Sequence, residues 1–320
     1  MHTPQTESEP NYSKYYYRVL LGGKNKYAEL CREKGFIGVD FSINQDLSPF
    51  LHDDYRDFNK EYIPLYQAKY PQKSKAVAGL SGGFTHSVCK VLENDDCVLS
   101  PDGKGNYMIG VVTGPYYYEE GGILPHRRPV RWLEKLIERS TMSITLQRSA
   151  GSSGTVCNLT NYTKEIEALL IGDSHGILES IENVVEDKVE FEMEKQLESF
   201  LIANWKQTEL GKNYDILEEN GEIIGQQYRT DTGPIDLLAI SKDKKELLVV
   251  ELKKGRPSDS VVGQIQRYMG FVLEEVVEKS QTVRGVIIGL GADKRIKRAL
   301  SVTNNIQFYR YEISFKLIQD

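Results

Sequence analysis

The sequence predicts an α/β (α+β) protein of two domains, in which a small curved β structure with added helices precedes a mixed sheet flanked by helices. Its 320 residues suffice for two domains of roughly 100–200 residues each. From Tyr15 to about Leu170 the chain is rich in Tyr, Gly and Pro with short apolar runs, which is typical of short strands and turns. From residue 189 onward the apolar periodicity is stronger, and strand patterns alternate with helical ones.

The first domain is expected at residues 13–150. Its patterns predict helices at 24–34 and 55–70 and strands at 35–41, 98–100, 107–113 and 128–133. Pro101-Asp-Gly-Lys-Gly105 is a turn sequence, so the strands on either side of it are expected to form a hairpin. Residues 151–188 are expected to form a linker between the domains.

The second domain is expected at residues 189–320. The predicted order is helix, a strand pair and two further strands, helix, strand, helix, strand. The segments are 190–204 for the first helix, 214–217 with 223–228 as a strand pair, 235–240, 247–252, 261–278, 283–289, 294–301 and 306–313. The first helix is predicted from the residues that fall largely on one helical stripe, which are Phe191, Met193, Leu197, Phe200 and Leu201.

Charge and apolar content exclude several classes of protein. Forty Lys and Arg against forty-six Asp and Glu give a net charge of −6, so indiscriminate binding of nucleic acid through bulk charge is not expected. A local basic patch remains compatible with this total. No apolar run approaches the ~20 residues of a membrane span. The N-terminus has no basic segment followed by an apolar one, so we expect a cytoplasmic protein without membrane contact.

Three residues of the second domain indicate phosphodiester chemistry. Glu251 and Lys253 alternate with Val250 and Leu252, so the two polar side chains are expected on one face of a strand and the apolar pair toward the core. Asp236 opens the preceding strand and can meet them at one edge of the sheet. Two carboxylates can hold a hard cation such as Mg²⁺ or Mn²⁺, with water and phosphate oxygens completing the shell. A neighbouring lysine can orient water and offset developing charge.

The spacing alone is a weak signal. Glu186-Asp-Lys188 is a second copy of Glu-x-Lys in a polar segment without a strand pattern. The alternative for the first copy is a solvated Glu and Lys at a strand end, with Asp236 as a turn residue. The hydrophobic strand around Glu251 and the order of the elements favour the catalytic interpretation.

Residues 190–320 resemble the C-terminal nuclease domain of NucS/EndoMS endonucleases, within the PD-(D/E)xK superfamily of restriction-endonuclease-like folds. The matching stretches are Glu194-Lys-Gln-Leu-Glu198-Ser-Phe-Leu, Gln227-Tyr-Arg-Thr, Gly233-Pro-Ile-Asp236-Leu-Leu-Ala, Val250-Glu251-Leu-Lys253-Lys-Gly and Gly263-Gln264-Ile-Gln-Arg-Tyr-Met-Gly270. The resemblance implies a mixed sheet flanked by helices. A departure is that Pro234 lies two residues before Asp236 rather than directly before it.

The same resemblance implies roles for five residues. Asp236 and Glu251 would be metal ligands and Lys253 the catalytic lysine. Glu198 would be an accessory acid, with Glu194 as the second choice, and Gln264 an accessory polar residue.

Further residues near this motif are candidates for DNA contact. Lys254 and Arg256 follow the motif strand and could bind phosphates. Tyr228 and Arg229 precede the turn before Asp236 and could also contact the nucleic acid.

The first domain resembles the EVE/PUA-like β-barrel class, whose members read modified or flipped bases in restriction proteins. The stretches that carry this looser resemblance are Gly35-Phe-Ile-Gly-Val-Asp-Phe41, Asp96-Cys-Val-Leu-Ser-Pro, Ile109-Gly-Val-Val-Thr-Gly-Pro-Tyr116-Tyr-Tyr118 and His126-Arg-Arg-Pro-Val-Arg-Trp132. A flipped base needs aromatic walls and donors for its edge. The candidate DNA-binding residues, as walls or as phosphate contacts, are Phe41, Tyr116, Tyr118, Arg127, Arg128 and Trp132. The alternative is that the aromatic residues are ordinary barrel core and rim.

These observations predict a metal-dependent DNA endonuclease with an N-terminal recognition domain, acting in modification-dependent restriction or defence. Its partner would be double-stranded DNA, with or without modified bases. Since one site cuts one strand, we expect a homodimer. A mismatch- or structure-specific repair endonuclease of the NucS type is one alternative. A non-catalytic DNA-binding module is another, against which the intact Asp236, Glu251 and Lys253 argue.

Overall fold

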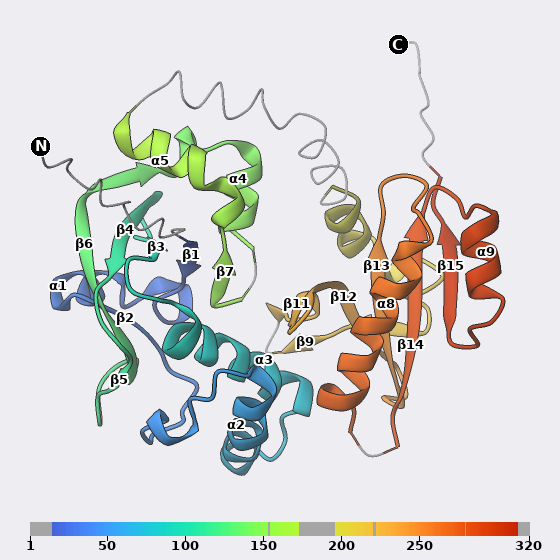
Figure 1. Ribbon diagram of the computed structural model, residues 1–320, viewed down its shortest axis with the longest axis horizontal. Helices are drawn as coiled ribbons and strands as arrows, with labels where there is room; N and C mark the ends of the chain where they lie inside the picture. The colour runs from blue at the N-terminus through green and yellow to red at the C-terminus, as the bar shows by residue number, and fades with distance from the viewer. Residues whose placement is uncertain (1–14, 153, 173–195, 220–221, 279, 313–320) are drawn as a thin grey trace, which may run out of the picture.

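The computed structural model describes residues 15–152, 154–172, 196–219, 222–278 and 280–312. Two mixed sheets with helices form its two halves, which confirms the predicted fold class (Figure 1). In the part of the chain that is described, no helix is long and apolar enough to cross a membrane.

The first sheet is an open, curved half-barrel. Its strands are β1 (Tyr16–Val19), β2 (Phe36–Val39), β3 (Cys97–Pro101), β4 (Asn106–Val112), β5 (Tyr117–Tyr118), β6 (His126–Glu138) and β7 (Val156–Asn158). They lie in the order β2-β6-β4-β3-β1-β7, with β5 on β6. The predicted hairpin is the antiparallel pair β3 and β4. Strand β7 pairs with β1 although the sequence assigned its residues to the linker, so the first sheet continues beyond residue 150.

Helices surround this sheet. They are η1 (Gly23–Asn25), α1 (Ala28–Lys34), η2 (Ser48–Phe50), α2 (Tyr55–Lys69), α3 (Lys75–His86), η3 (Ser87–Val91), η4 (Arg139–Thr141), α4 (Ile144–Ala150), η5 (Thr160–Tyr162) and α5 (Thr163–Ile171). The sequence did not predict α3, whose glycines ordinarily disfavour a helix. Tertiary packing decides its formation: a Cβ at Gly82 would lie 2.4 Å from Asn59 Oδ1, so the small residue lets α3 approach α2 closely.

The second sheet follows the predicted order. Its strands are β8 (Tyr214–Ile216), β11 (Gln226–Thr230), β12 (Gly233–Ser241), β13 (Glu246–Leu252), β14 (Thr282–Gly289) and β15 (Ile306–Arg310), with β9 (Glu218–Glu219) and β10 (Glu222–Ile223) as a separate small pair. Strands β11, β12 and β13 are antiparallel, and β13, β14 and β15 are parallel.

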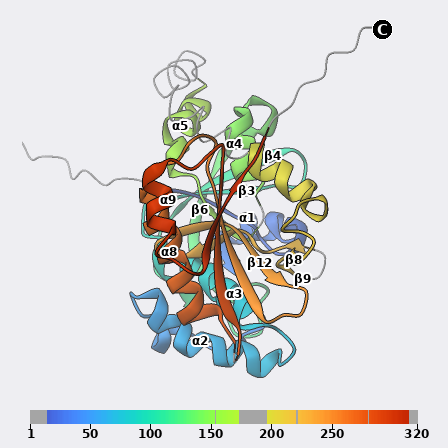
Figure 2. The same cartoon turned by 90° about the vertical axis from the view of Figure 1, so that its right-hand side faces the viewer.

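Both faces of the second sheet are covered. Helices α8 (Ser260–Phe271), η7 (Val272–Val276) and α9 (Lys294–Leu300) lie on one face, and the helix at 196–203, followed by η6 (Trp205–Gln207), lies on the other (Figure 2). Consecutive residues Val249 and Val250 therefore enter two different apolar clusters, one on each face. A strand buried on both faces reads as a continuous apolar run, as this one does. Val250 and Leu252 are buried as expected, and the opposite face, which carries Val249 and Glu251, is buried as well.

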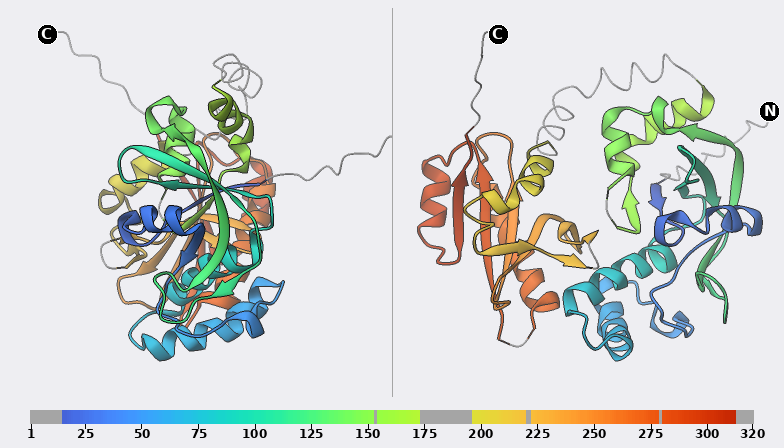
Figure 3. Two further views of the ribbon diagram at one scale, coloured as in Figure 1. Left: turned by 90° about the vertical axis from the view of Figure 1, so that its left-hand side faces the viewer. Right: turned by 180° about the vertical axis from the view of Figure 1, so that it is seen from behind.

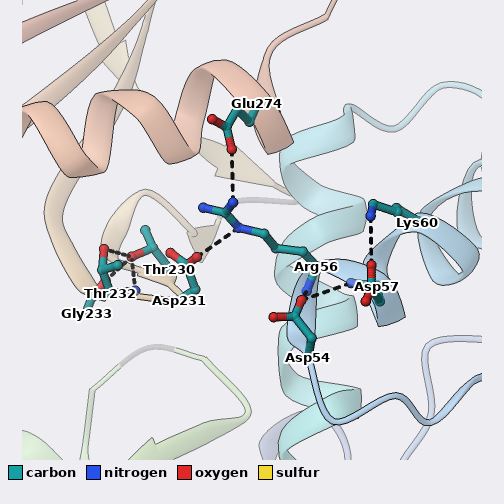
Figure 4. A network of polar contacts seen from close by, with 9 residues as sticks. All are labelled: Asp54, Arg56, Asp57, Lys60, Thr230, Asp231, Thr232, Gly233 and Glu274. Atoms are coloured by element: carbon teal, nitrogen blue, oxygen red, sulfur yellow. Dashed lines mark hydrogen bonds and ion pairs between the residues drawn. The ribbon is translucent and has the colours of Figure 1, made fainter.

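Helices α2 and α3 lie between the two sheets and connect them (Figures 1 and 3). Arg56 on α2 forms ion pairs with Asp231 in the turn between β11 and β12, at 2.9 Å, and with Glu274 in η7, at 3.1 Å (Figure 4). The rings of Tyr55 and Phe271 stack across the same boundary. Ala76 of α3 belongs to the apolar cluster of the second sheet, so the two halves share a core.

His86, at the end of α3, is a titratable residue packed at this boundary. Its ring packs against Tyr55 and Phe58, and its Nε2 lies 2.9 Å from the carbonyl oxygen of His52. Burial lowers the pKa of His86, and the positive charge of Arg229 lowers it further.

The buried ring of His86 should make the fold sensitive to acid. Because its pKa is depressed in the folded state, the stability that neutral His86 contributes is fully present above its unfolded pKa of about 6.5 and is lost as pH falls toward the folded value. Between about pH 7.5 and about pH 5.5, the wild type should lose up to about 1 kcal/mol more than His86→Gln. Thermal unfolding at both pH values measures this, with His52→Gln, an exposed position, as the control that keeps the wild-type loss. Equal losses in all three proteins would contradict the assignment to His86.

Candidate active site

Asp236, Glu251 and Gln227 lie opposite one another on three neighbouring strands of the second sheet. Leu237 pairs with Val250, so the next pair in the antiparallel register is Asp236 opposite Glu251. On the other side, Gln226 pairs with Leu237 and Tyr228 with Ile235, which places Gln227 opposite Asp236. Residues directly opposite in an antiparallel pair have Cβ atoms about 4.5–5.5 Å apart. The register alone therefore brings Asp236 and Glu251 together.

Asp236 is held at both carboxylate oxygens. Its Oδ2 accepts a hydrogen bond from the backbone N–H of Leu252 at 2.7 Å, and its Oδ1 accepts one from Gln227 Nε2 at 3.1 Å. Removal of water and the negative charge of Glu251 raise the pKa of Asp236 well above its usual value, and Glu198 adds to this. Negative charge is therefore costly here, and a cation between the acids would relieve that cost.

Glu251 and Lys253 form an ion pair just where β13 ends. Lys253 Nζ lies 2.8 Å from Glu251 Oε1, and the side chain of Glu251 is 2% exposed while that of Lys253 is 26% exposed. The backbone N–H of Lys253 donates to the carbonyl of Ile288, which fixes the start of the side chain. The ammonium group thus meets both the buried acid and the solvent, where a substrate would approach.

Glu198 joins the acids from the helix at 196–203. It is 4% exposed, and its two carboxylate oxygens accept hydrogen bonds from the side chains of Gln226 and Gln227. The Nε2 group of Gln227 therefore donates to Glu198 and to Asp236 at once. Glu194, the second choice for this acid, lies outside the described residues.

Gln264 is a half-buried residue of α8. Its Nε2 donates to the hydroxyl of Tyr268, one turn further along the helix, at 3.3 Å. Burial raises the pKa of Tyr268, and the charges of Glu251 and Asp236 raise it further. The charges of the two acids therefore act on the partner of Gln264.

The donors present could hold a hard cation. Carboxylate oxygens of Asp236 and Glu251 are the ligand type that Mg²⁺ and Mn²⁺ take, with water and phosphate oxygens completing the shell. Within the described ranges, no cluster of three or more His, Cys, Asp or Glu side chains has the arrangement of a complete metal site. A cation here would thus depend on this acid pair and on ligands from solvent and substrate.

The residues expected to contact DNA near this site fall into two groups. Arg256 is exposed and Lys254 half-buried, both on the loop after β13. Tyr228 is 2% exposed, with its hydroxyl donating to the carbonyl of Ala76 at 2.9 Å. Arg229 is half-buried and donates to Ser87 Oγ. Tyr228 and Arg229 thus lie at the boundary between the domains. The burial of Tyr228 does not fit the expected DNA contact, whereas for the half-buried Arg229 that contact stays a prediction.

Several candidate residues of the first domain form hydrogen bonds to backbone carbonyls of the same domain. Arg128 is 5% exposed, with Nε donating to the carbonyl of Gly114 at 2.7 Å and Nη1 to that of Leu92. Arg127 donates to the carbonyls of Leu124 and Ile123 and lies over the ring of Phe36. The buried position of Arg128 does not fit a contact with phosphates.

The aromatic candidates do not form a single wall. Trp132 donates from Nε1 to the carbonyl of Cys31, whereas Phe41 stacks on Phe84. Tyr116 and Tyr118 both lie against the ring of His126, which is 1% exposed. The structure therefore groups the two tyrosines and places Trp132 elsewhere.

Sequence reasoning did not assign roles to Gln226, Gln227 and Tyr268. Gln227 and Tyr268 both lie within stretches that carry the resemblance. Two features of the sequence could have indicated them. Gln227 lies on the strand that precedes and pairs with the strand of Asp236, and Tyr268 follows Gln264 by four residues, on the same helical face.

Comparisons with known proteins assign the two halves separately. Residues 17–160 match the model of a domain of unknown function (DUF8426), and residues 204–314 match the endonuclease NucS C-terminal domain. Residues 204–314 are therefore similar to a NucS C-terminal domain, as the sequence predicted. The resemblance of the first half to EVE/PUA-like domains stays a prediction.

Curated relatives support the second assignment. Endonuclease NucS of Methanocaldococcus jannaschii is 30% identical over 103 residues, which are 31% of this chain and 36% of the relative. Endonuclease NucS of Sulfolobus acidocaldarius is 32% identical over 106 residues, 33% of this chain and 39% of the relative. The matches thus span little more than a third of the length of these relatives.

This chain also matches solved structures. One is a repair endonuclease from Pyrococcus abyssi, with a TM-score of 0.30 and 17% identity over 66% of each chain. An EndoMS–dsDNA complex gives a TM-score of 0.29 and 14% identity over 68% of this chain and 65% of the other.

The position of Tyr228 leads to a prediction that separates packing from DNA contact. Tyr228→Phe removes the buried hydrogen bond to the carbonyl of Ala76 and should lower the free energy of unfolding by about 0.5–1.5 kcal/mol. Affinity for a DNA duplex should stay unchanged, because the hydroxyl is buried. Chemical denaturation and fluorescence anisotropy with a labelled duplex measure the two quantities. A clear loss of DNA affinity with unchanged stability would restore Tyr228 as a DNA contact.

Proposed function

We propose that the protein is a metal-dependent DNA endonuclease that hydrolyses phosphodiester bonds, with the first domain selecting the DNA. The observation that carries this proposal is the facing pair Asp236 and Glu251 with Lys253 ion-paired beside it, in a domain that matches the NucS C-terminal family. The two curated relatives are endonucleases, which is consistent with it.

The site residues would divide the chemistry among them. Asp236 and Glu251 would hold Mg²⁺ or Mn²⁺, and the bound cation would supply Lewis-acid stabilisation of the phosphate oxygens. The ammonium of Lys253, partly exposed next to Glu251, would orient the attacking water and offset charge that develops on the phosphate. Glu198 and Gln264 would orient the neighbouring groups. Lys254 and Arg256 would contact the backbone of the bound duplex.

For the substrate, we propose DNA with modified bases as the first candidate, in restriction or defence. Tyr116 and Tyr118, grouped on His126, are the aromatic surface with which the first domain could stack a flipped base. A second candidate is mismatch- or structure-directed repair, which the NucS match of residues 204–314 favours. Cutting both strands would require two copies of the site, so a homodimer forms part of the proposal.

Cleavage assays test the active-site assignment. The wild type should cut a plasmid in the presence of Mg²⁺, and Lys253→Ala should lower the rate by about 10²–10⁴-fold, because the group that moves or orients protons is lost. Lys242→Ala, at an exposed lysine on the turn after β12, is the matched control and should cut at the wild-type rate. Gel electrophoresis of the plasmid forms gives the rates. Equal rates for the wild type and Lys253→Ala would remove Lys253 from the mechanism.

The choice of DNA distinguishes the candidate substrates. The same assay is run on plasmids with and without cytosine modification and on matched, mismatched and branched duplexes. Preference for modified plasmid supports the restriction role, and preference for mismatched or branched duplexes supports repair. Tight DNA binding without cleavage of any substrate would instead indicate a non-catalytic module.

Cation binding should be visible without any DNA. At about ten times its Kd, Mn²⁺ should stabilise the wild type by about 1.4 kcal/mol, because it binds the folded acids only. Asp236→Asn should lose this response, since it removes one of the two carboxylates. Asp243→Asn, on the exposed turn between β12 and β13, should keep it. Differential scanning calorimetry with and without Mn²⁺ measures the shift, and the same shift in Asp236→Asn would place the cation elsewhere.

A further inference from the structure

Strand β11 contacts the acids at one end and the first domain at the other. At its beginning, Gln226 and Gln227 donate to Glu198, and Gln227 also donates to Asp236. At its far end, Tyr228 and Arg229 contact α3 and η3. A five-residue strand thus touches both the candidate active site and the domain boundary.

The conformation of Gln227 makes its double contact possible. Side chains of neighbouring residues in a regular strand point to opposite faces, yet Gln226 and Gln227 both reach Glu198. Gln227 has a φ of 50°, in the left-handed region that non-glycine residues rarely occupy. This backbone conformation costs roughly 1–2 kcal/mol for a residue with a side chain. Strain of this kind persists only where the surrounding structure fixes it.

The first domain supplies the contacts that fix the far end of β11. The guanidinium of the half-buried Arg229 donates to Ser87 Oγ, and burial lowers the pKa of Arg229. The hydroxyl of Tyr228 is bound by the carbonyl of Ala76. Arg56 adds an ion pair with Asp231, directly after the strand (Figure 4). All three contacts come from helical segments of the first domain.

We propose that Gln227 is a positioning residue for Glu198 and Asp236, and that the first domain sets its conformation through Arg229. The inference rests on the proposed nuclease for its kinetic consequence, but its effect on the acids is measurable by cation binding alone.

Gln227→Gly separates positioning from structural support. Glycine adopts a φ of 50° readily, so the substitution relieves backbone strain while it removes the amide. We expect an Mn²⁺ affinity about tenfold weaker, the usual scale for groups that hold metal ligands. The unfolding temperature without metal should change little, because relief of the backbone strain offsets part of the cost of leaving the two acids without the amide donor. Calorimetric titration with MnCl₂ and thermal unfolding without metal measure the two quantities on the full chain. A purely structural role would leave the affinity unchanged.

Ser87→Ala tests transmission from the first domain. It removes the acceptor of Arg229 at a residue that touches none of the acids, and it should weaken Mn²⁺ affinity at least twofold. Lys75→Ala is the matched control. It removes a contact between the domains that does not involve β11, from Lys75 Nζ to the carbonyl of Glu274, and should leave the affinity unchanged.

The outcomes separate this inference from the proposed function. Wild-type cleavage and Mn²⁺ binding, with Gln227→Gly and Ser87→Ala indistinguishable from the wild type, overturn the inference and leave the nuclease intact. Weakened binding in Gln227→Gly with unchanged binding in Ser87→Ala supports the positioning role and overturns its control by the first domain. A wild type that binds no Mn²⁺ and cuts no DNA overturns both proposals.

Discussion

The dominant interaction in the candidate site is the electrostatic repulsion between the carboxylates of Asp236 and Glu251, which lie close together. The register between β12 and β13 places the two acids opposite each other, and their neighbours leave little water around them. Such an arrangement disfavours the folded state unless donors and cations offset the charge. Leu252 N–H, Gln227 and Lys253 supply part of that compensation. The apolar packing on both faces of the sheet holds the acids in place against their repulsion.

That packing extends beyond the second domain. Helix α3 contributes Ala76 to the same apolar cluster as the strands and α8, and α2 contributes the ion pairs of Arg56. The first domain, which is proposed to select DNA, therefore contributes side chains to the packing of the second domain, which is proposed to cut it. Such contacts give the first domain a physical route to the acids, because β11 lies between the two.

Much of the second domain followed from its sequence. Strands β12, β13 and β14 lie within one or two residues of their expected positions, since runs of apolar residues between turn sequences leave few alternatives. The first domain was harder to predict. Helix α3 contains glycines that disfavour helices, and β7 is a three-residue strand that depends on pairing with β1. Both owe their structure to distant partners that local patterns do not report.

The sequence by itself determined the chemistry of the candidate site: Asp236, Glu251 and Lys253 were identifiable from residue type, spacing and strand alternation. Only the tertiary structure decided which other groups meet them. Gln227 reaches two acids because its backbone adopts a positive φ, and Tyr228 and Arg128 are buried because each satisfies a backbone carbonyl far away in the chain. The sequence does not show whether a polar or aromatic side chain faces solvent or the core. Its partners from distant parts of the chain determine whether it is buried.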